Sequence, residues 1–413
     1  MPSRPARPLR LAFLSLLETE PWGGSEPLWL ATACRAASKG HAVAASVRGW
    51  PGTDERLAPL AGLGAEVFQR VYAGDDDDPE PGPHPSSPPP PLAPRRLHRR
   101  VAATVAARRR GRPGVALVDD RLLEFRPDLL VVNQGAHYDI GDRGVTALLA
   151  DLACPYVVIT HAVDERHDPR PGARARLRSA YSGAGARGFS TDAVAEAVER
   201  QLAMSVSPRF LFTNPLPELP PVPLPWPEQG SGAASLAFVG RVSIAKGVDL
   251  LLDVLSRPPW PDRDVHLHLY GEVRQEDYLR DLIGHLDLTG RVTVEGPTAD
   301  VAEVWARHEL LVLPSRSEGA PLSVAEAMAC GRPVVATAVG GLREWVVDDV
   351  TGFLARGVER HEVADALERA WTARARWPDL GRCAHERIMA WLDPDPPGAL
   401  LERLEAVAQR AMG

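Results

Sequence analysis

The sequence predicts an α/β protein built from two doubly wound parallel sheets. Three observations support this fold class. Short apolar runs alternate with amphipathic helical segments along the chain, a proline-rich stretch at 215–227 separates two such series, and the 413 residues suffice for two or three domains. Parallel strands need helical crossovers and are buried on both faces, which accounts for the near-continuous apolar runs.

In the N-terminal half, apolar runs such as RLAFLSLL and PYVVIT read as buried strands. We expect strands at 9–16, 42–47, 66–69, 128–132, 155–160 and 187–190. Amphipathic helices are expected at 25–38 and 191–204.

The C-terminal half repeats this pattern. We expect strands at 235–239, 265–270, 291–295, 309–313, 333–336 and 352–354. Helices are expected at 247–255, 275–286, 298–306, 322–329 and 362–373. Ligands of open α/β sheets bind beyond the carboxyl ends of the strands, so two such units predict a ligand cleft between them.

Composition excludes several classes of protein. The net charge of -7 and the pI of about 6.0 give no overall basic field for nucleic acid. The four cysteines lie far apart, which argues against a CxxC site or a disulfide framework and favours a reducing cytosol. No apolar stretch approaches the ~20 residues of a spanning helix, and residues 9–17 lack the cleavage site of a signal peptide.

The first candidate site is the loop GRVSIAKG at 240–247. A strand ends at Gly240 and a helix opens near Gly247, which places Arg241 and Lys246 beside a helix N-terminus. Two cations and the positive end of a helix dipole suit a pyrophosphate. Only two of the 47 basic residues are lysines, so Lys246 suggests a point charge that an arginine would not replace well.

The second candidate site is the segment SRSEGAPLSVAEAMACG at 315–331. A strand delivers Glu318 to its end, Gly319 permits close approach of backbone, and Pro321 suits the first helical turn. The N–H groups that follow Pro321 are expected to point at an anion. Glu326, eight residues after Glu318, is placed to accept hydrogen bonds from a vicinal diol such as ribose.

The third is PWGGSE at 21–26, which follows the first strand and opens a helix. It is not GxGxxG, so support for dinucleotide binding is weak. Adjacent Gly23 and Gly24 can still turn backbone N–H groups toward a phosphate or sugar, while the alternative is a plain tight turn.

Together these features resemble the family 4 retaining glycosyltransferases of the GT-B fold. The resemblance is strongest from 235 to 355: it includes G-R-x4-K-G at 240–247, E-x7-E at Glu318 and Glu326, AMACGRPVVATAVGGLREWV at 327–346 and DDVTGFL at 348–354. It implies transfer of a sugar, with retention of configuration, from a nucleotide-diphospho-sugar. It implies no cofactor beyond that substrate and no metal for the diphosphate.

The resemblance also implies roles for single residues. Arg241 and Lys246 would neutralise the diphosphate, Glu318 would hold hydroxyls of the donor sugar, and Glu326 would bind the ribose. Further donor contacts would come mainly from backbone groups, at Gly23, Gly24, Gly240, Gly319, Ala320, Pro321 and Leu322.

The N-terminal half departs from the family pattern. Many relatives carry a histidine just after the fourth strand, where this chain has Asn133 and Gln134, with His137 farther along. These three residues, and His161 at the end of the next strand, are candidate sugar or acceptor contacts.

The expected domains are a Rossmann-like acceptor domain at 1–213, a linker at 214–227 and a Rossmann-like donor domain at 228–385. As in relatives, the segment 386–413 would cross back to the N-terminal domain. The Pro- and Asp-rich stretch at about 74–94 is expected to be a disordered insertion, so its acids at 75–78 are not interpreted as a DxD metal site.

The basic amphipathic segment 95–112 is either a solvated helix or a docking face for an anionic membrane or acceptor. Two alternatives to sugar transfer stay open. One is a GT-B nucleotide-sugar epimerase or hydrolase, which would consume no acceptor. The other is an inactive sugar-nucleotide-binding protein. The residues do not identify the base, the sugar or the acceptor.

Overall fold

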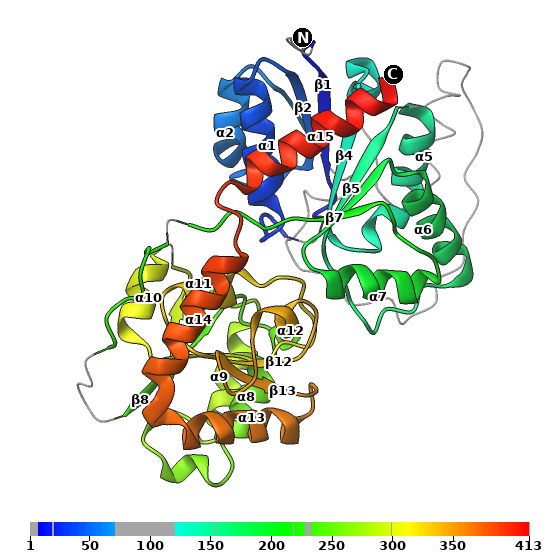
Figure 1. Cartoon of the computed structure of the whole chain (residues 1–413). Helices are drawn as coiled ribbons and strands as arrows, with labels where there is room; N and C mark the ends of the chain where they lie inside the picture. Colours follow the sequence, from blue (N-terminus) through cyan, green and yellow to red (C-terminus); the bar gives the residue numbers. More distant parts are fainter. Residues whose placement is uncertain are drawn as a thin grey trace. The chain divides into compact units, whose positions relative to one another are not determined.

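Two β-sheets organise the chain (Figure 1). In this computed structural model the described residues are 7–18, 20–70, 120–152, 154–217, 219–227, 233–298 and 300–412. The first sheet has the strand order β3-β2-β1-β4-β5-β6-β7, and the second has the order β10-β9-β8-β11-β12-β13. Strand order therefore reverses at the pairs β1/β4 and β8/β11, which are the switch points where such sheets bind ligands.

The strands of the first sheet are β1 (Arg10–Ser15), β2 (Ala42–Arg48), β3 (Glu66–Arg70), β4 (Leu129–Ala136), β5 (Tyr156–Ala162), β6 (Ala186–Phe189) and β7 (Arg209–Leu211). Those of the second are β8 (Ala234–Val239), β9 (Val265–Tyr270), β10 (Val292–Gly296), β11 (Leu310–Leu313), β12 (Val334–Thr337) and β13 (Gly352–Ala355). Every strand expected from the sequence is present, and β7 is an addition.

The helices in the first half of the chain are α1 (Glu26–Ser38), α2 (Thr53–Gly62), α4 (Asp120–Phe125), α5 (Arg143–Leu152), α6 (Pro171–Gly183) and α7 (Asp192–Leu202). Those in the second half are α8 (Val248–Leu255), α9 (Glu276–His285), α10 (Val301–Arg307), α11 (Leu322–Ala329), α12 (Leu342–Trp345), α13 (Arg360–Thr372), α14 (Trp377–Trp391) and α15 (Pro396–Met412). Short 3-10 turns that matter below are η1 (Asp139–Gly141) and η2 (Ile244–Lys246).

Contacts divide the chain into two compact units. The first unit comprises Met1–Ile159, Pro169–Arg187 and Leu400–Gly413, and the second comprises Thr160–Asp168 and Gly188–Ala399. Within the first unit, Glu405 of α15 accepts hydrogen bonds from Lys39 Nζ at 2.8 Å and pairs with His41 Nε2 at 2.9 Å, so this helix lies beside the end of α1 (Figure 1). The domain boundaries given above stay predictions.

Burial explains the apolar strand runs. Leu11, Ala12 and Phe13 of β1 are fully buried, as is the run Leu129–Val132 of β4, because helices cover both faces of a parallel sheet. The parallel register continues to Ser15↔Asn133, so the chain leaves β1 and β4 at adjacent points. In the second sheet, β11 and β12 are equally buried.

The proline-rich segment is anchored within the second unit. The buried Arg332 donates to the carbonyls of Leu224 at 3.2 Å and Pro225 at 2.7 Å, and Leu224 N–H donates to Cys330 O at 3.2 Å. Proline carbonyls remain available as acceptors although proline lacks an N–H, so a single guanidinium can hold this segment against the end of α11.

Two predicted segments, 74–94 and 95–112, lie outside the described residues, as do the acids at 75–78. Within the described ranges, none of the helices combines the length and the apolar character that crossing a bilayer would require.

Candidate functional site

The loops that follow β8 and β11 lie at the switch point of the second sheet. These strands pair in parallel through Leu310↔Leu236 and Leu311↔Ala237, so their carboxyl ends meet at one edge. The loop 240–247 leaves β8 and the loop 314–321 leaves β11. Both candidate segments of the second half therefore converge, as their positions after neighbouring strands predict.

Lys246 and Glu318 form a close ion pair at this edge. Lys246 Nζ donates to Glu318 Oε1 at 2.7 Å and to Oε2 at 2.8 Å. Glu318 is 6% exposed, while the Lys246 side chain is 20% exposed. An ammonium has three donors, so one N–H of Lys246 remains for a further partner. The pairing itself was not predicted, because the sequence indicates separate ligands for the two side chains.

A hydroxyl supports the carboxylate of Glu318. Ser315 Oγ, fully buried, donates to Glu318 Oε1 at 2.6 Å, and Thr337 Oγ1 donates to Ser315 O at 2.5 Å. The carboxylate is thus held by an ammonium and a hydroxyl from fixed backbone positions. Such a preorganised group keeps its direction when a ligand arrives.

A second ion pair fixes the Lys246 loop. Arg316 donates to both carboxylate oxygens of Asp249 on α8, at 2.7 and 2.8 Å, and also to the carbonyl of Ile244. Its backbone N–H donates to Ala245 O at 2.9 Å. The hydrogen bonds to Asp249 raise the pKa of Arg316, which stays charged. Arg316 therefore ties η2, and with it Lys246, to the loop after β11.

Two glycines permit this close packing. Gly247 has φ of 76°, and a Cβ there would lie 2.0 Å from Pro314 O. A Cβ on Gly319 would lie 1.8 Å from His161 O. Both positions require glycine because backbone occupies the space of a side chain. The sequence explains Gly319 by approach of a ligand, whereas in the structure the close neighbour is the backbone of residue 161.

The turn into α11 differs slightly from the prediction. Pro321 occupies the N-cap position and not the first helical turn, since α11 begins at Leu322 and Pro321 has the extended ψ of 119°. Val324 N–H donates to Pro321 O at 3.1 Å. The N–H groups of Leu322 and Ser323 precede the first intrahelical donor, which leaves them for another acceptor. Their binding of an anion stays a prediction.

Glu326 lies one turn into α11 and is 8% exposed. Burial raises the pKa of its carboxyl to about 7. Among the described residues, no hydrogen bond or ion pair to this carboxylate is found. A buried carboxylate without a partner is costly, so this position favours a ligand that supplies hydroxyl donors.

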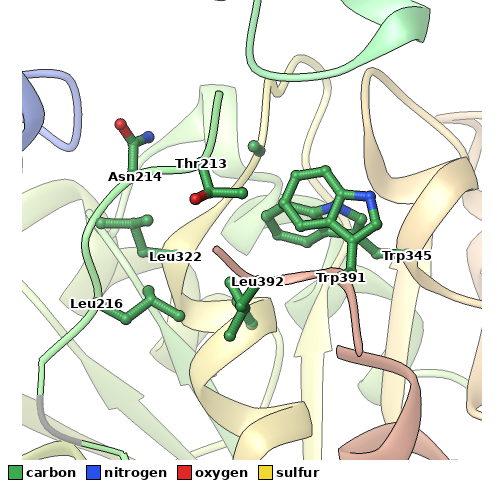
Figure 2. A pocket seen from close by; sticks show the side chains of 9 residues that line it. Thr213, Asn214, Leu216, Leu322, Trp345, Trp391 and Leu392 are labelled. Carbon is green, nitrogen blue, oxygen red and sulfur yellow. The ribbon is translucent and has the colours of Figure 1, made fainter. Parts of the chain in front are cut away.

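The side chains of Ala320 and Leu322 point to a different surface. Together with Ala325 of α11, they line a small, largely apolar pocket. The other residues that line this pocket are 213, 214 and 216, Trp345, Trp391 and Leu392 (Figure 2). The two indole rings meet edge to face with centroids 4.9 Å apart. This packing holds the start of α11, and the predicted ligand contacts of Ala320 and Leu322 would then come from their backbone groups.

Arg241 follows Gly240, whose φ is 145°. Its side chain is half-buried in the loop that leads to Lys246. Its phosphate contact and the sugar contacts of Glu318 stay predictions.

In the first unit, Gly23 and Gly24 form the turn into α1. Glu26 N–H donates to Gly23 O at 3.1 Å, and Ser25 is the N-cap. Glu26 is buried and accepts hydrogen bonds from Trp29 Nε1 at 2.7 Å and from Asn133 Nδ2 at 3.3 Å. Burial raises the pKa of Glu26, and hydrogen bonds from the side chains of Trp29, Ser15 and Ser25 lower it in part.

Asn133 and Gln134 are both buried, at 1% and 0% exposed. Asn133 holds Glu26, whereas Gln134 Nε2 donates to Tyr181 Oη at 2.8 Å and its Oε1 accepts from Ile140 N–H at 2.9 Å. These amides serve the interior of the unit, and their predicted contacts with a sugar or acceptor remain untested.

The two candidate histidines are also buried. His137 is 0% exposed and stacks edge to face with Tyr138. His161, in the second unit, packs against Phe212 with centroids 4.8 Å apart, and burial lowers its pKa to about 3. His161 is therefore neutral at pH 7. Contact of either ring with a ligand stays a prediction.

Sequence reasoning missed Ser315, Arg316 and Asp249. Ser315 and Arg316 belong to the candidate segment 315–331, and only their spacing from Glu318 could have indicated their roles. Asp249 lies in the first turn of α8, where an acid is common near the positive end of the helix dipole. Its pairing with Arg316 is a tertiary contact.

Comparison with known proteins finds a family match within the second unit. Residues 233–373 match the family model described as "Glycosyl transferases group 1". This segment is therefore similar to group 1 glycosyltransferases. A D-inositol 3-phosphate glycosyltransferase of Pseudarthrobacter chlorophenolicus is 38% identical over 188 residues, which cover 44% of this chain and 45% of the relative. An uncharacterized glycosyltransferase of Methanocaldococcus jannaschii is 37% identical over 137 residues, 32% of this chain and 36% of the relative. The matched segments thus span less than half the length of these relatives.

Solved structures extend the likeness to the whole fold. Anabaena HepE in complex with UDP and glucose superposes with a TM-score of 0.66 at 18% identity, covering 96% of this chain and all of the other. Sucrose-phosphate synthase of Thermosynechococcus elongatus gives a TM-score of 0.65 at 17% identity, covering 96% and 98%. With its two parallel-sheet α/β units, the chain has the GT-B fold.

Proposed function

We propose that this protein transfers a sugar from a nucleotide-diphospho-sugar to a hydroxyl acceptor, with retention of configuration. The observation that carries the proposal is the edge of the second sheet. There Lys246 pairs with Glu318, three residues before the N-cap of α11, and α11 carries Glu326, whose carboxylate has no partner found among the described residues. These supply a cation, free N–H groups and a diol-binding carboxylate, the three things a nucleoside diphosphate needs.

The donor would bind along this edge. Lys246 would use its third N–H for a phosphate oxygen while it keeps Glu318 in place. The N–H groups of Leu322 and Ser323 would bind the same diphosphate, and Glu326 would accept from the two ribose hydroxyls. Glu318, fixed by Ser315, would accept from hydroxyls of the donor sugar.

The chemistry then depends on the leaving group. The acceptor oxygen would approach on the side from which the nucleotide diphosphate departs. The bond from the anomeric carbon to phosphate oxygen breaks as the new glycosidic bond forms, and a phosphate oxygen takes the acceptor's proton. Negative charge grows on the departing diphosphate, so Lys246, Arg241 and the α11 terminus would stabilise the transition state more than the ground state.

The names of similar proteins support this class of reaction. The relative from Pseudarthrobacter is a glycosyltransferase named for D-inositol 3-phosphate, and the Anabaena structure holds UDP and glucose. UDP-sugars are therefore the first donors to examine. A cytosolic location remains a further prediction.

A donor screen tests the proposal. Thermal shifts with UDP-, GDP-, ADP- and TDP-sugars should identify one base that stabilises the protein, and product analysis with that donor should show a glycoside with retained anomeric configuration. Release of free sugar or an epimer without any acceptor product would instead favour the hydrolase or epimerase alternative. Donor binding without turnover would favour an inactive binding protein.

Fixed cations and a helix terminus can serve a diphosphate without a metal. We therefore expect turnover to survive excess EDTA. We also expect replacement of the acids at 75–78 by serine to leave kcat within about twofold of wild type, as for solvated charges. A strict requirement for Mn²⁺ or Mg²⁺ in the chemical step would contradict this account.

A further inference from the structure

The switch point of the first sheet carries an acid that the proposed donor chemistry does not use. Asp139 begins η1, just after the carboxyl end of β4, and β1 is the neighbouring strand. Leu16 N–H donates to Asn133 O at 2.8 Å, so the chain after β1 starts beside the end of β4. Glu18 lies in that chain. This is the edge at which an open α/β sheet binds its ligand.

Asp139 is held on a rigid turn. Gln134 Oε1 accepts from Ile140 N–H at 2.9 Å, and Tyr181 Oη donates to His137 O at 3.1 Å. Arg176 Nε donates to Gly141 O at 2.8 Å. Three buried or half-buried side chains thus fix the backbone on both sides of Asp139, although none bonds its carboxylate.

The carboxylate itself is incompletely satisfied. Ala136 N–H donates to Asp139 Oδ2 at 3.0 Å, and among the described residues no other hydrogen bond or ion pair to this carboxylate is found. Burial, and then the charge of Glu18, raise the pKa of Asp139 to about 7. The Ala136 N–H lowers that pKa only in part.

The neighbouring charges favour a neutral ligand. Glu18 is paired with Arg70, which is 2% exposed and also donates to Ser46 Oγ at 3.0 Å and Ser15 O at 2.6 Å. Arg70 is therefore occupied by groups of β1 and β2, and Arg176 of α6 serves a carbonyl. The charged group that shifts the pKa of Asp139 is the acid Glu18, which disfavours an anion here.

We propose that Asp139 binds the acceptor, accepting a hydrogen bond from a hydroxyl of a neutral polyol such as a sugar or cyclitol. This inference rests on the proposed function and adds the acceptor class and a residue that holds it. Asp139 is half-buried, so its carboxylate can be reached by a ligand. A rigid carboxylate at a switch point can accept hydrogen bonds from hydroxyl donors, and a polyol supplies these without bringing charge. Gln134 is then a positioning residue, since it fixes the turn that presents Asp139.

The first test uses Asp139→Asn. With a donor and polyol acceptor that give transfer, acceptor KM should rise about 10- to 100-fold, the usual range for losing a hydrogen bond to a charged group, while donor KM changes less than about twofold. The matched control is Asp142→Asn on the same turn. Asp142 Oδ1 accepts from Gly144 N–H at 2.6 Å as a helix cap, and asparagine caps equally well.

The pH dependence of kcat/KM for the acceptor gives a second measurement, which would not change if Asp139 had only a structural role. The ionised carboxylate of Asp139 has two oxygens that accept hydrogen bonds and no O–H. The wild-type kcat/KM for the acceptor substrate should therefore rise with pH through about 7, the pKa to which burial and Glu18 raise Asp139. In this pH range, kcat/KM for the acceptor substrate should not change in Asp139→Asn, whereas Asp142→Asn should keep the pH dependence of the wild type. If acceptor KM of Asp139→Asn matched that of Asp142→Asn, the assignment would be wrong even though transfer itself stood.

A measurement on the wild-type protein covers the case of a variant that does not fold. Carboxyl ¹³C NMR should show Asp139 titrating near pH 7, and 100 mM myo-inositol or D-glucose should lower that midpoint, because hydroxyl donors favour the ionised form. An unchanged midpoint with both polyols overturns the inference. Failure of every nucleotide sugar to bind would instead overturn the proposed function, so the two failures are distinguishable.

Discussion

The two switch points of this protein have the same topology but differ in the charged group that faces the acid. In the second sheet, the acid after β11 is Glu318, and the loop after β8 meets it with Lys246. In the first sheet, the acid after β4 is Asp139, and the chain after β1 brings a second acid, Glu18, close enough to raise the pKa of Asp139. Each edge therefore holds an ion pair, Lys246 with Glu318 and Arg70 with Glu18. The edge of the first sheet also carries a second acid, Asp139, for which no cationic partner is found among the described residues.

This difference separates two kinds of ligand. A cation held by an acid keeps its charge and direction, and it suits a diphosphate whose negative charge grows during reaction. An acid beside another acid repels anions and gains from neutral hydroxyl donors. The fold sets the edges at which a ligand is expected, whereas under the proposed function the residues after the switch-point strands would decide whether an edge binds the donor or the acceptor.

The largest expected effect comes from removing the cation. Lys246→Ala takes away the charge that would bind the diphosphate and leaves Glu318 buried without its ammonium. We expect donor kcat/KM to fall by about 10²–10³-fold, as for other desolvated charge contacts, and affinity for the nucleoside diphosphate to fall far more than that for the nucleoside. Steady-state kinetics and calorimetry measure both.

Lys39→Ala is the matched control, since it removes the only other lysine of the chain. Lys39 is half exposed, and its pair with Glu405 lies at the surface of the first unit. Such pairs contribute little to stability. If donor kcat/KM fell equally in both variants, or if Lys246→Ala kept wild-type affinity for the diphosphate, Lys246 would not be the diphosphate-binding cation.

The two glutamates of the second unit should fail differently. Glu318→Gln loses the charge opposite Lys246 at the proposed sugar position, so kcat should fall about 10- to 100-fold through misplacement of the reacting carbon. Glu326→Gln loses binding shared by ground and transition states, so donor KM should rise about tenfold with little change in kcat. If Glu326 alone controlled kcat, the assigned roles would be reversed.

Much of this arrangement could be predicted from the sequence. The strand, turn and helix around 240–247 and 315–331 place Lys246, Glu318 and Glu326 on one sheet edge, because parallel strands share that edge. The partners could not be predicted. Ser315 holding Glu318 and Asp249 holding Arg316 are contacts between side chains whose types are common in any loop or helix start.

In the first unit the sequence favours Asn133 and Gln134 over Asp139, for a physical reason. Polar residues at the end of a strand are expected to face a ligand, but here the neighbouring Glu26 and the turn at Ile140 need internal partners, and the amides meet that need. The sequence did not predict β7 or α6. The three residues of β7 are too few to show a pattern, and α6 buries only Leu177, Ala180 and Tyr181 among arginines and small residues.

A smaller effect concerns stability and pH. The pKa of Glu326 is about 7 in the folded protein and near 4.5 in the unfolded chain. A raised carboxyl pKa means that the unfolded state loses its proton first, so this group lowers stability as pH rises from about 4.5 to 7 and holds it lowered above. At pH 8 the free energy of unfolding of Glu326→Gln should therefore exceed that of the wild type by roughly 1–3 kcal/mol. At pH 4.5 the two proteins should be about equally stable.

Thermal unfolding at both pH values measures this difference. Addition of the preferred nucleoside diphosphate should stabilise wild type more than the variant at pH 8, because ribose hydroxyls favour the ionised Glu326. A variant that is less stable than wild type at pH 8 without ligand would show that Glu326 is already satisfied within the protein, and the unpartnered carboxylate would cease to mark a ribose site.

The smallest expected effect tests how the cation is positioned. Asp249→Asn removes the charge that holds Arg316 at 2.7 and 2.8 Å, and Arg316 is the link between η2 and the loop after β11. Lys246 keeps its own pair with Glu318, so we expect donor kcat/KM to fall only about 3- to 10-fold, through looser alignment of the ammonium with the leaving group. Asp253→Asn is the control, because Asp253 lies one turn later on α8 and pairs with the exposed Arg257 at 2.8 Å. Donor kcat/KM of the two variants is compared at equal folded fraction. If Asp249→Asn has the same donor kcat/KM as Asp253→Asn, Arg316 only joins two loops. Glu318 and Ser315 would then suffice to orient Lys246.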